Sequence, residues 1–298
     1  MNITLTGSLG NIGRPLAHDL VQKGHEVTVI SSSADRQQEI EAIGAKAAIG
    51  TMTDVDFLTE TFKGADIVYV METLGPRAFF DPNVDPVAEV TAIGKVYKQA
   101  IGQSGVKKIV HLSSIGAHRE KDNGLLAFHH NVENILSELP QDVAIKFMRP
   151  VGFYTNLFSF IPVIKQFGAI FTNYGGDEIQ LWVSPKDIAS AITEEMEKPF
   201  EGRTIRYIAS EELSTNTVAH ILGEAIGKPD LQWQVISDEQ MLQNLKAAGM
   251  SPKTAEGYVE MMADRETLYE DYYKHRPALG KTKMKDFAKD FAAAYNKQ

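Results

Sequence analysis

Residues 2–30 read NITLTGSLGNIGRPLAHDLVQKGHEVTVI, and this stretch decides the fold. The β-branched run Asn2–Thr6 predicts a short buried strand that leads directly into the glycine-rich segment Gly7–Gly13. An amphipathic helical pattern follows and ends near Gly24, and Glu26–Ile30 predicts a second buried strand. The order strand, glycine-rich turn, helix and strand indicates one βαβ unit.

Each glycine of this turn has a physical role in binding a dinucleotide. Gly7 permits the tight turn, Gly10 lets the backbone approach a pyrophosphate, and Gly13 lets the helix pack close to the sheet. The helix N-terminus offers N–H groups and a positive dipole end to the phosphates. The spacing is G-x-x-G-x-x-G, and glycines also collect in ordinary surface turns, but the flanking strand and helix favour the dinucleotide interpretation. The predicted cofactor-binding residues of this segment are Thr6, Gly7, Leu9, Gly10, Asn11, Ile12 and Gly13.

Composition narrows the possible functions. The chain has 298 residues, a net charge of −9 and no block of Lys or Arg, which disfavours binding to nucleic acid or an anionic membrane. It has no cysteine, so disulfides, thiol catalysis and cysteine-ligated metals are excluded. No apolar run reaches the roughly 18 residues that a membrane helix needs, and the first strand leaves no room for a signal peptide. We therefore expect a cytoplasmic globular protein with ample apolar content for a core.

The residues after the second strand bear on the choice of cofactor. An acid at this place binds the 2′-hydroxyl of NAD, whereas a nearby Arg suits the 2′-phosphate of NADP. The sequence has Ser31, Ser32 and Ser33 here, with Arg36 slightly further on, which favours NADP. NAD stays an alternative because Asp35 could take the acid's part. The same run also fits a helix N-cap at Ser33 or Asp35.

The β/α alternation continues through the first half of the chain. Further strands are predicted over residues 45–49, 65–71, 106–112 and 144–148, with helices over 54–62 and about 87–102. This pattern predicts an α/β fold with a doubly wound parallel sheet. Open sheets of this kind bind ligands at the carboxyl ends of their strands. The expected further contacts at that edge are Met71, Glu72, Thr73, Ser113 and Ser114, and the loop over residues 72–86 starts there.

Three motifs together resemble a known family. They are T-G-x-x-G-x-x-G at residues 6–13, K-K-I-V-H-L-S-S at 107–114 and F-M-R-P-x-x-F-Y-x-N at 147–156. The segment W-V-S-P-K-D at 182–187 fits the same pattern. The chain resembles, over nearly its whole length, the NmrA-like branch of the atypical short-chain dehydrogenase/reductases. Within it, the chain looks most like bacterial NAD(P)H quinone oxidoreductases and triphenylmethane reductases.

The resemblance implies a Rossmann-like NADP-binding domain with a smaller, mainly C-terminal α+β lobe. The expected limits are residues 1–150 plus about 180–210 for the first, and about 151–180 plus 211–298 for the second. The resemblance also places Pro150 among the cofactor contacts. It implies reduction of quinones, dyes or other conjugated acceptors, although some relatives are non-catalytic regulators that sense NADP.

The sequence departs from the standard Tyr-x-x-x-Lys pair of the wider family, in which the phenol moves the substrate proton. With Glu133 as the anchor, the Lys position falls on His129 and the Tyr position on Leu125. His129 and Glu133 resemble a His-x-x-x-Glu variant of the quinone and dye reductases, and their spacing would allow a hydrogen bond on one helical face. His129 could hold the ribose hydroxyls, donate a proton, or simply be a packed helical histidine. The adjacent His130 points about 100° away on a helix, so the pair is a poor metal site and no metal is predicted.

The loss of the tyrosine still permits one class of hydride transfer. A quinone or an extended cation accepts hydride through its own electron affinity, so the protein mainly has to align donor and acceptor. A simple ketone would need a proton donor that the sequence does not offer. Aromatic residues are dense after residue 150 and could form either core or the wall of a flat pocket. Phe153, Tyr154 and Asn156 are the expected pocket residues.

Helices are predicted over residues 215–227, with Thr215 or Asn216 near the cap, and over 251–273 and 283–295. The leading functional hypothesis is an NADPH-dependent reductase of an aromatic or quinone-like acceptor, active as a monomer or homodimer. The second is a non-catalytic regulator that binds NADP and a protein partner. The third is an isomerase or epimerase that uses the nicotinamide transiently, which the absent tyrosine weakens.

Overall fold

A computed structural model describes residues 1–263 and 265–297. Its central sheet has seven parallel strands in the order β10-β6-β5-β4-β1-β2-β3. The strand order reverses between β1 and β4, because the chain builds one half outward from β1 and then returns to build the other. The bounds are β1 Asn2–Leu5, β2 Glu26–Ser31, β3 Lys46–Ile49, β4 Ile67–Met71, β5 Lys108–Leu112, β6 Ala144–Pro150 and β10 Arg203–Ile208.

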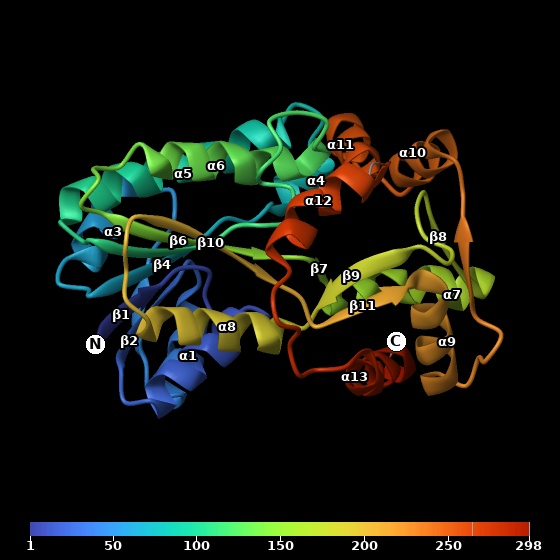
Figure 1. The fold of residues 1–298 in the computed structure, drawn as a ribbon, viewed down its shortest axis with the longest axis horizontal. Coiled ribbons are helices and arrows are strands. Elements are labelled where there is room, and N and C mark those ends of the chain that lie inside the picture. The colour runs from blue at the N-terminus through green and yellow to red at the C-terminus, as the bar shows by residue number, and fades with distance from the viewer. Residues whose placement is uncertain (264, 298) are drawn as a thin grey trace.

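Helices cover both faces of this sheet (Figure 1). On one face, α1 (Gly13–Gln22) packs beside α8 (Pro185–Glu197), and apolar residues such as Leu16, Leu20 and Ile188 are buried beneath them. The other face carries α3 (Val55–Phe62), α5 (Pro86–Ser104) and α6 (Ala127–Ser137), which pack in that order over a second apolar cluster. This is the predicted doubly wound, Rossmann-like architecture.

A smaller, mainly C-terminal region adjoins the sheet. Two minor sheets, β11-β9-β7 and β12-β8, share a third apolar cluster with the helices around them. The strands are β7 Gly152–Phe153, β8 Ala169–Thr172, β9 Ile179–Val183, β11 Glu211–Ser214 and β12 Gln232–Val235. The helices are η3 Tyr154–Phe160, α7 Ile161–Phe167, α9 Thr215–Ala225, α10 Asp238–Ala247, α11 Pro252–Ala263, α12 Arg265–His275 and α13 Met284–Lys297. The exact domain limits given above stay a prediction.

Some local expectations need correction. The segment after β2 forms a short 3₁₀ helix, η1 (Ala34–Arg36), and then α2 (Gln37–Ala42), and within the described chain neither start has a side-chain cap bond. Instead the Ser31 hydroxyl bonds to the backbone N–H and C=O of Ser33 and turns the chain.

The cap of α9 is also one residue earlier than expected. The Ser214 hydroxyl accepts a hydrogen bond from the Thr217 N–H. Thr215 and Asn216 turn their side chains to the carbonyl of Gly176 and the carboxylate of Asp177. The expected helix over 251–273 corresponds to α11 and α12, and residue 264 between them lies outside the described residues.

The loop over residues 72–86 contains a helix that its local pattern does not predict. This helix, α4 (Pro76–Phe80), is held by α11, because Ser251 N–H and the Thr254 hydroxyl donate to the carbonyls of Phe79 and Ala78. Among the described residues, no helix is both long and apolar enough to cross a bilayer.

Candidate functional site

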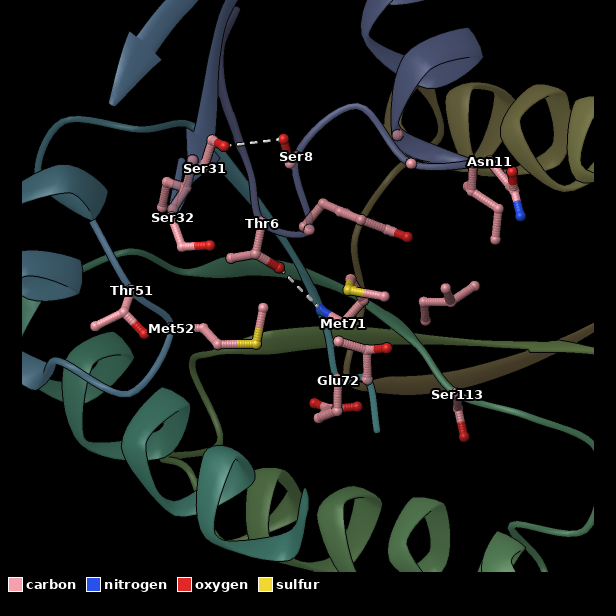
Figure 2. A pocket seen from close by; sticks show the side chains of 18 of the residues that line it. Thr6, Ser8, Asn11, Ser31, Ser32, Thr51, Met52, Met71, Glu72 and Ser113 are labelled. Atoms are coloured by element: carbon pink, nitrogen blue, oxygen red, sulfur yellow. Dashed lines mark hydrogen bonds between the residues drawn. The ribbon is translucent and has the colours of Figure 1, made fainter. Parts of the chain in front are cut away.

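One cavity of about 560 Å³ lies at the carboxyl ends of the central strands, where the order reverses between β1 and β4 (Figure 2). The glycine-rich turn forms one wall, and the ends of β2, β4 and β5 form the next. His129 of α6 and Phe153 of β7 also line it. The predicted residues that line this cavity are Thr6, Gly7, Gly10, Asn11, Ile12, Gly13, Ser31, Ser32, Met71, Glu72, Thr73, Ser113, Ser114, His129 and Phe153.

Other predicted residues lie outside this lining. Leu9 is buried in the apolar core, and Tyr154 is buried with its hydroxyl donating to Glu211 Oε2 at 2.9 Å. The Pro150 carbonyl accepts a hydrogen bond from Ile115 N–H. The full set of predicted residues outside the lining is Leu9, Ser33, Arg36, Glu133, Pro150, Tyr154 and Asn156.

The cavity also includes residues that sequence reasoning missed. They are Ser8, Ile30, Gly50, Thr51, Met52, Tyr69 and Leu112. Gly50–Met52 follow β3 directly, so the rule that placed the loops after β4 and β5 at the site would also have found them. The sequence after the third strand, Gly50–Met52, carries no chemical motif that would single it out.

The geometry of the turn distinguishes its three glycines. Gly7 has φ +86°, and a Cβ there would lie 2.6 Å from Met71 Sδ. A Cβ at Gly13 would lie 2.1 Å from the Ser8 carbonyl oxygen, whereas at Gly10 the nearest atom would be 3.6 Å away. The protein itself therefore requires glycine at the first and third positions. At Gly10 the space is open toward the cavity, which fits a turn that receives a pyrophosphate.

Polar contacts fix the turn against its neighbours. Thr6 Oγ1 accepts from Met71 N–H at 3.0 Å, which ties β1 to the end of β4 (Figure 2). The Ser8 hydroxyl donates to Ser31 Oγ at 3.1 Å and ties the turn to β2. Helix α1 starts at Gly13, which lines the cavity. The N–H groups of Arg14 and Leu16 donate to the carbonyls of Gly10 and Ile12, and Pro15 has no N–H, so the helix start offers the Gly13 N–H and its positive dipole end to an anion.

A pair of arginines lies just outside the cavity, beyond Ser31 and Ser32. Arg14 Nη2 and Arg36 Nη1 both contact Glu39 Oε2, at 2.7 and 2.9 Å. The Arg14 and Arg36 guanidiniums hold the pKa of the Glu39 carboxyl below its usual value. Arg36 is one of the predicted cofactor-binding residues, whereas the sequence did not indicate Arg14 or Glu39.

At the other end, the structure corrects the expected bond between His129 and Glu133. The Glu133 carboxylate instead accepts from Arg149, with Nε to Oε1 at 2.9 Å and Nη2 to Oε2 at 2.6 Å. The Ser113 hydroxyl donates to the same Oε1. Both carboxylate oxygens are therefore held by β5 and β6, and Glu133 positions Ser113 at the cavity wall.

His129 lines the cavity without a bond to that carboxylate. Its ring lies 4.1 Å from the ring of Phe128, and its Nδ1 atom is buried without a hydrogen-bond partner in the described chain. Burial, and then the charge of His111, hold the pKa of His129 well below its ordinary value. The imidazole is therefore neutral at pH 7. Leu125, at the position of the usual tyrosine, is buried and packs against Gly257.

Residues 1–263 and 265–297 contain no group of three or more acidic or histidine side chains arranged to hold a metal ion. The site is thus a cavity with a glycine turn, a serine-rich and arginine-flanked end, and an end with a histidine and an aromatic ring.

Comparison with known proteins is consistent with this geometry. The chain is 26% identical over 262 residues to an NAD(P)H azoreductase of Xenophilus azovorans, which covers 88% of this chain and 86% of that protein. Two solved structures share the fold at TM-scores of 0.74 and 0.75. The first is the Citrobacter sp. triphenylmethane reductase complexed with NADP(H), at 20% identity over 97% of this chain and 99% of the other. The second is an NADPH-dependent quinone oxidoreductase of Escherichia coli complexed with NADPH, at 18% identity over the same shares.

A family model described as NmrA-like matches residues 1–292. Because this match spans almost the whole chain, the protein belongs to the NmrA-like family.

Proposed function

We propose that this protein is an NADPH-dependent reductase of a quinone, an azo compound or another conjugated aromatic acceptor. The observation that carries the proposal is that one cavity joins the glycine turn to His129 and Phe153. The nucleotide-binding part and a place for a flat acceptor are therefore continuous. The azoreductase and the quinone and dye reductases among the similar proteins support the same class of reaction.

The residues present fit a nicotinamide dinucleotide. The open space at Gly10 and the first turn of α1 suit the pyrophosphate, and Ser31 and Ser32 suit the adenine ribose. Arg14 and Arg36 add positive charge beside that ribose end, which favours NADP over NAD. NADH is the alternative donor.

The chain's own residues would mainly bind and orient. When bound, the reduced nicotinamide supplies a hydride to the acceptor. Thr73 and Ser113 follow the carboxyl ends of β4 and β5 and line the cavity, and Ser113 is held by Glu133. Both side chains would fix the orientation of the nicotinamide half. Phe153 offers an aromatic face for a flat acceptor, and the largely apolar surroundings of His129 exclude water.

The test is consumption of NADPH, and of NADH in parallel, with quinones, azo dyes and cationic triarylmethane dyes. We expect turnover with at least one class, and faster turnover with NADPH. Gly10→Trp should abolish cofactor binding, since the indole would fill the open space of the turn. Tight binding of NADPH with no turnover by any acceptor would contradict a reductase and favour an NADP-binding regulator, the function that the missing tyrosine and lysine also allow.

A further inference from the structure

A buried acid–base pair lies at the cavity wall, where Glu72 is one of the lining residues. Glu72 follows Met71 at the end of β4 (Figure 2), and His111 lies on the neighbouring strand β5. The register pairs Val70 with His111, so Glu72, two residues further on, is on the same face of the sheet. Glu72 Oε2 and His111 Nε2 are 2.9 Å apart, and both side chains are 0% exposed. The pair faces the apolar layer under α5 and α6.

Three polar atoms of this region lack the partners that burial normally demands. Glu72 Oε1, His111 Nδ1 and His129 Nδ1 are all buried without a hydrogen-bond partner among the residues that the structure describes. Buried polar atoms are satisfied in the great majority of cases, so each exception needs an explanation. A buried charge pair is also a poor source of stability compared with apolar packing. A function is the better explanation for keeping these groups beside a ligand cavity.

The surroundings isolate the pair electrostatically. Burial, and then the charge of Glu72, raise the pKa values of Tyr69 on β4 and Tyr97 on α5, so both phenols stay neutral. On β5 and β6 the next polar groups, Ser113 and Arg149, are committed to Glu133 of α6. Among the described residues, the next titratable group at this wall is His129 of α6, which lines the same cavity as Glu72. The influence of His111 contributes to the lowered pKa of His129, after burial.

We propose that Glu72, His111 and His129 form a proton relay that delivers one proton to the acceptor in the cavity. The relay rests on the reductase function proposed above and supplies the proton that the missing tyrosine would otherwise give. His129 is its catalytic residue because it gives the proton to the acceptor in the cavity, and His111 and Glu72 act through it as positioning residues, although Glu72 also lines the cavity.

The step balances in atoms and electrons. The acceptor gains a hydride on one atom of its conjugated bond, with the nicotinamide oxidised, and gains a proton from His129 Nε2 on the other. As that proton leaves, His129 Nδ1 receives one from His111 Nδ1, directly or through one water molecule, and the proton that lies between Glu72 Oε2 and His111 Nε2 stays on His111, bonded to the Glu72 carboxylate. Solvent then returns one proton to His111 Nδ1. A neutral imidazole can pass a proton in this way because it accepts at one nitrogen while donating at the other.

Acceptors of different chemistry separate this proposal from general damage to the protein. Reduction of a quinone or an azo bond needs both a hydride and a proton. A cationic triarylmethane dye becomes its neutral product by taking a hydride alone. Loss of the relay should therefore slow the first two acceptors and spare the third.

The test compares His111→Gln, at a position outside the cavity lining, with the wild type on all three acceptors. The amide nitrogen of glutamine can keep the hydrogen bond to Glu72 but cannot pass a proton. We expect quinone and azo reduction to fall about 10- to 100-fold, with unchanged dye reduction and unchanged NADPH dissociation constant. His130→Gln is the matched control, because His130 is on the same helix but bonds to the Ala117 carbonyl and Asn134. It should leave all three rates unchanged.

A spectroscopic measurement gives a second readout in the cofactor-free protein. The ring-nitrogen NMR signals of His129, assigned with His129→Gln, should shift in Glu72→Gln because the two residues share one relay, and should not shift in His130→Gln. Equal slowing of all three acceptors, no slowing, or an unmoved His129 signal would each overturn the relay. Inactivity of the wild type toward every acceptor would instead overturn the proposed reductase, and the relay with it as a catalytic device.

Discussion

At the residue scale, two glycines of the turn have different roles, because Gly13 is required for the fold and Gly10 is proposed to bind the cofactor. A Cβ at Gly13 would lie 2.1 Å from the Ser8 carbonyl oxygen, so Gly13→Ala forces the backbone apart. We expect it to lower the free energy of unfolding by about 2 kcal/mol. A Cβ at Gly10 meets its nearest atom at 3.6 Å, so Gly10→Ala should fold normally and weaken NADPH binding about tenfold or more. Urea unfolding and cofactor titration of both variants measure the two effects.

The contrast between the two variants is the informative result. Gly24→Ala in the turn after α1 is a useful comparison for strain alone, because Gly24 has φ +81° and no atom near its Cβ position. If Gly10→Ala binds NADPH as tightly as the wild type, the phosphate does not approach this residue, and the assignment of the turn is wrong.

A second residue-scale prediction concerns the choice between NADPH and NADH. Glu39 neutralises part of the charge of Arg14 and Arg36, which flank the expected 2′-phosphate position. Glu39→Gln should free both guanidiniums and strengthen NADPH binding about three- to tenfold relative to NADH. Dissociation constants for both cofactors measure it, and the gain should shrink at high salt because these side chains are exposed. Glu41→Gln, on the same helix, is the control. An equal change for both cofactors would argue against a 2′-phosphate site at these arginines.

The limits of sequence reasoning are clear at this scale. The glycine turn could be predicted because its strand, glycines and helix are contiguous. The partners of Glu133 could not, because Ser113 and Arg149 lie 20 and 16 residues away and meet it only through the order of β5 and β6. Helical spacing suggested His129 instead, a contact that the tertiary structure does not make. The pair of Glu72 and His111, 39 residues apart, was hidden for the same reason.

At the element scale, α8 is joined to the edge strand β10 by a cluster of charges. Glu194 contacts Lys198 and Arg206, and Glu195 contacts Lys146, Lys198 and Arg206. Hydrogen bonds from Lys198 and Arg206 lower the pKa of Glu194 to about 2 from 4.5. At Glu195 burial raises the pKa of the carboxyl, but hydrogen bonds from Lys198, Lys146 and Arg206 outweigh burial, so the pKa is lowered.

These shifts predict a specific loss of stability in acid. A carboxyl whose pKa is lower in the folded state stabilises the fold fully above its unfolded pKa, here 4.5, and the contribution disappears as the pH falls through about 2. Glu194→Gln should therefore lower stability at pH 7 by less than about 1 kcal/mol, since its side chain is half-exposed and screened. Glu195→Gln, at a more buried position, should lower it further. Unfolding curves at pH 7, 4 and 2.5 measure these differences.

The difference between each variant and the wild type should shrink from pH 4 to 2.5, because the stabilisation by these carboxylates declines as the pH falls below 4.5 toward 2. The exposed Glu201→Gln is the control, and its difference from the wild type should be small at every pH. A constant difference between Glu194→Gln and the wild type from pH 7 to 2.5 would show that packing, not charge, explains the effect.

Elements could be predicted from sequence where local signals were strong. The inner strands β1, β4 and β5 are mostly buried runs rich in β-branched residues, and β4 and β5 lie within the expected ranges 65–71 and 106–112. Helix α4 could not be predicted, because its carbonyls are held by Ser251 and Thr254, far along the chain. The start of α9 was misplaced by one residue because Thr215, Asn216 and Ser214 are all good cap residues, and only their tertiary partners decide among them.

At the scale of the whole molecule, one carboxylate joins three distant segments. Asp187 is in the first turn of α8, and it accepts hydrogen bonds from the Ser210 hydroxyl at 2.6 Å and from the N–H and hydroxyl of Thr282, both at 3.0 Å. Ser210 lies between β10 and β11, and Thr282 lies just before α13. Asp187 is the last residue of the segment W-V-S-P-K-D, residues 182–187, which is part of the family resemblance. In the structure this residue connects α8 to the two other segments.

Asp187→Ala should loosen the C-terminal helix without unfolding the sheet. It removes three hydrogen bonds to a charged acceptor, and we expect the free energy for local opening of α13 to fall by about 2 to 3 kcal/mol. Amide hydrogen exchange in residues 284–297 should then accelerate about 30- to 150-fold, whereas exchange in β1 and β4 should stay near the wild-type rate. The NADPH dissociation constant should not change, because Asp187 lies outside the cavity lining.

The exposed Asp290→Asn on α13 is the matched control and should leave exchange unaltered. If exchange in β1 and β4 rises as much as in α13, the C-terminal helix and the central sheet unfold as one cooperative unit. Asp187 then stabilises the whole unit and not α13 alone. If neither changes, the apolar contacts of Phe287 and Phe291 in the third core cluster hold α13 without the carboxylate. The expected result, fast exchange confined to α13 with intact cofactor binding, requires that the central sheet be stable independently of helix α13.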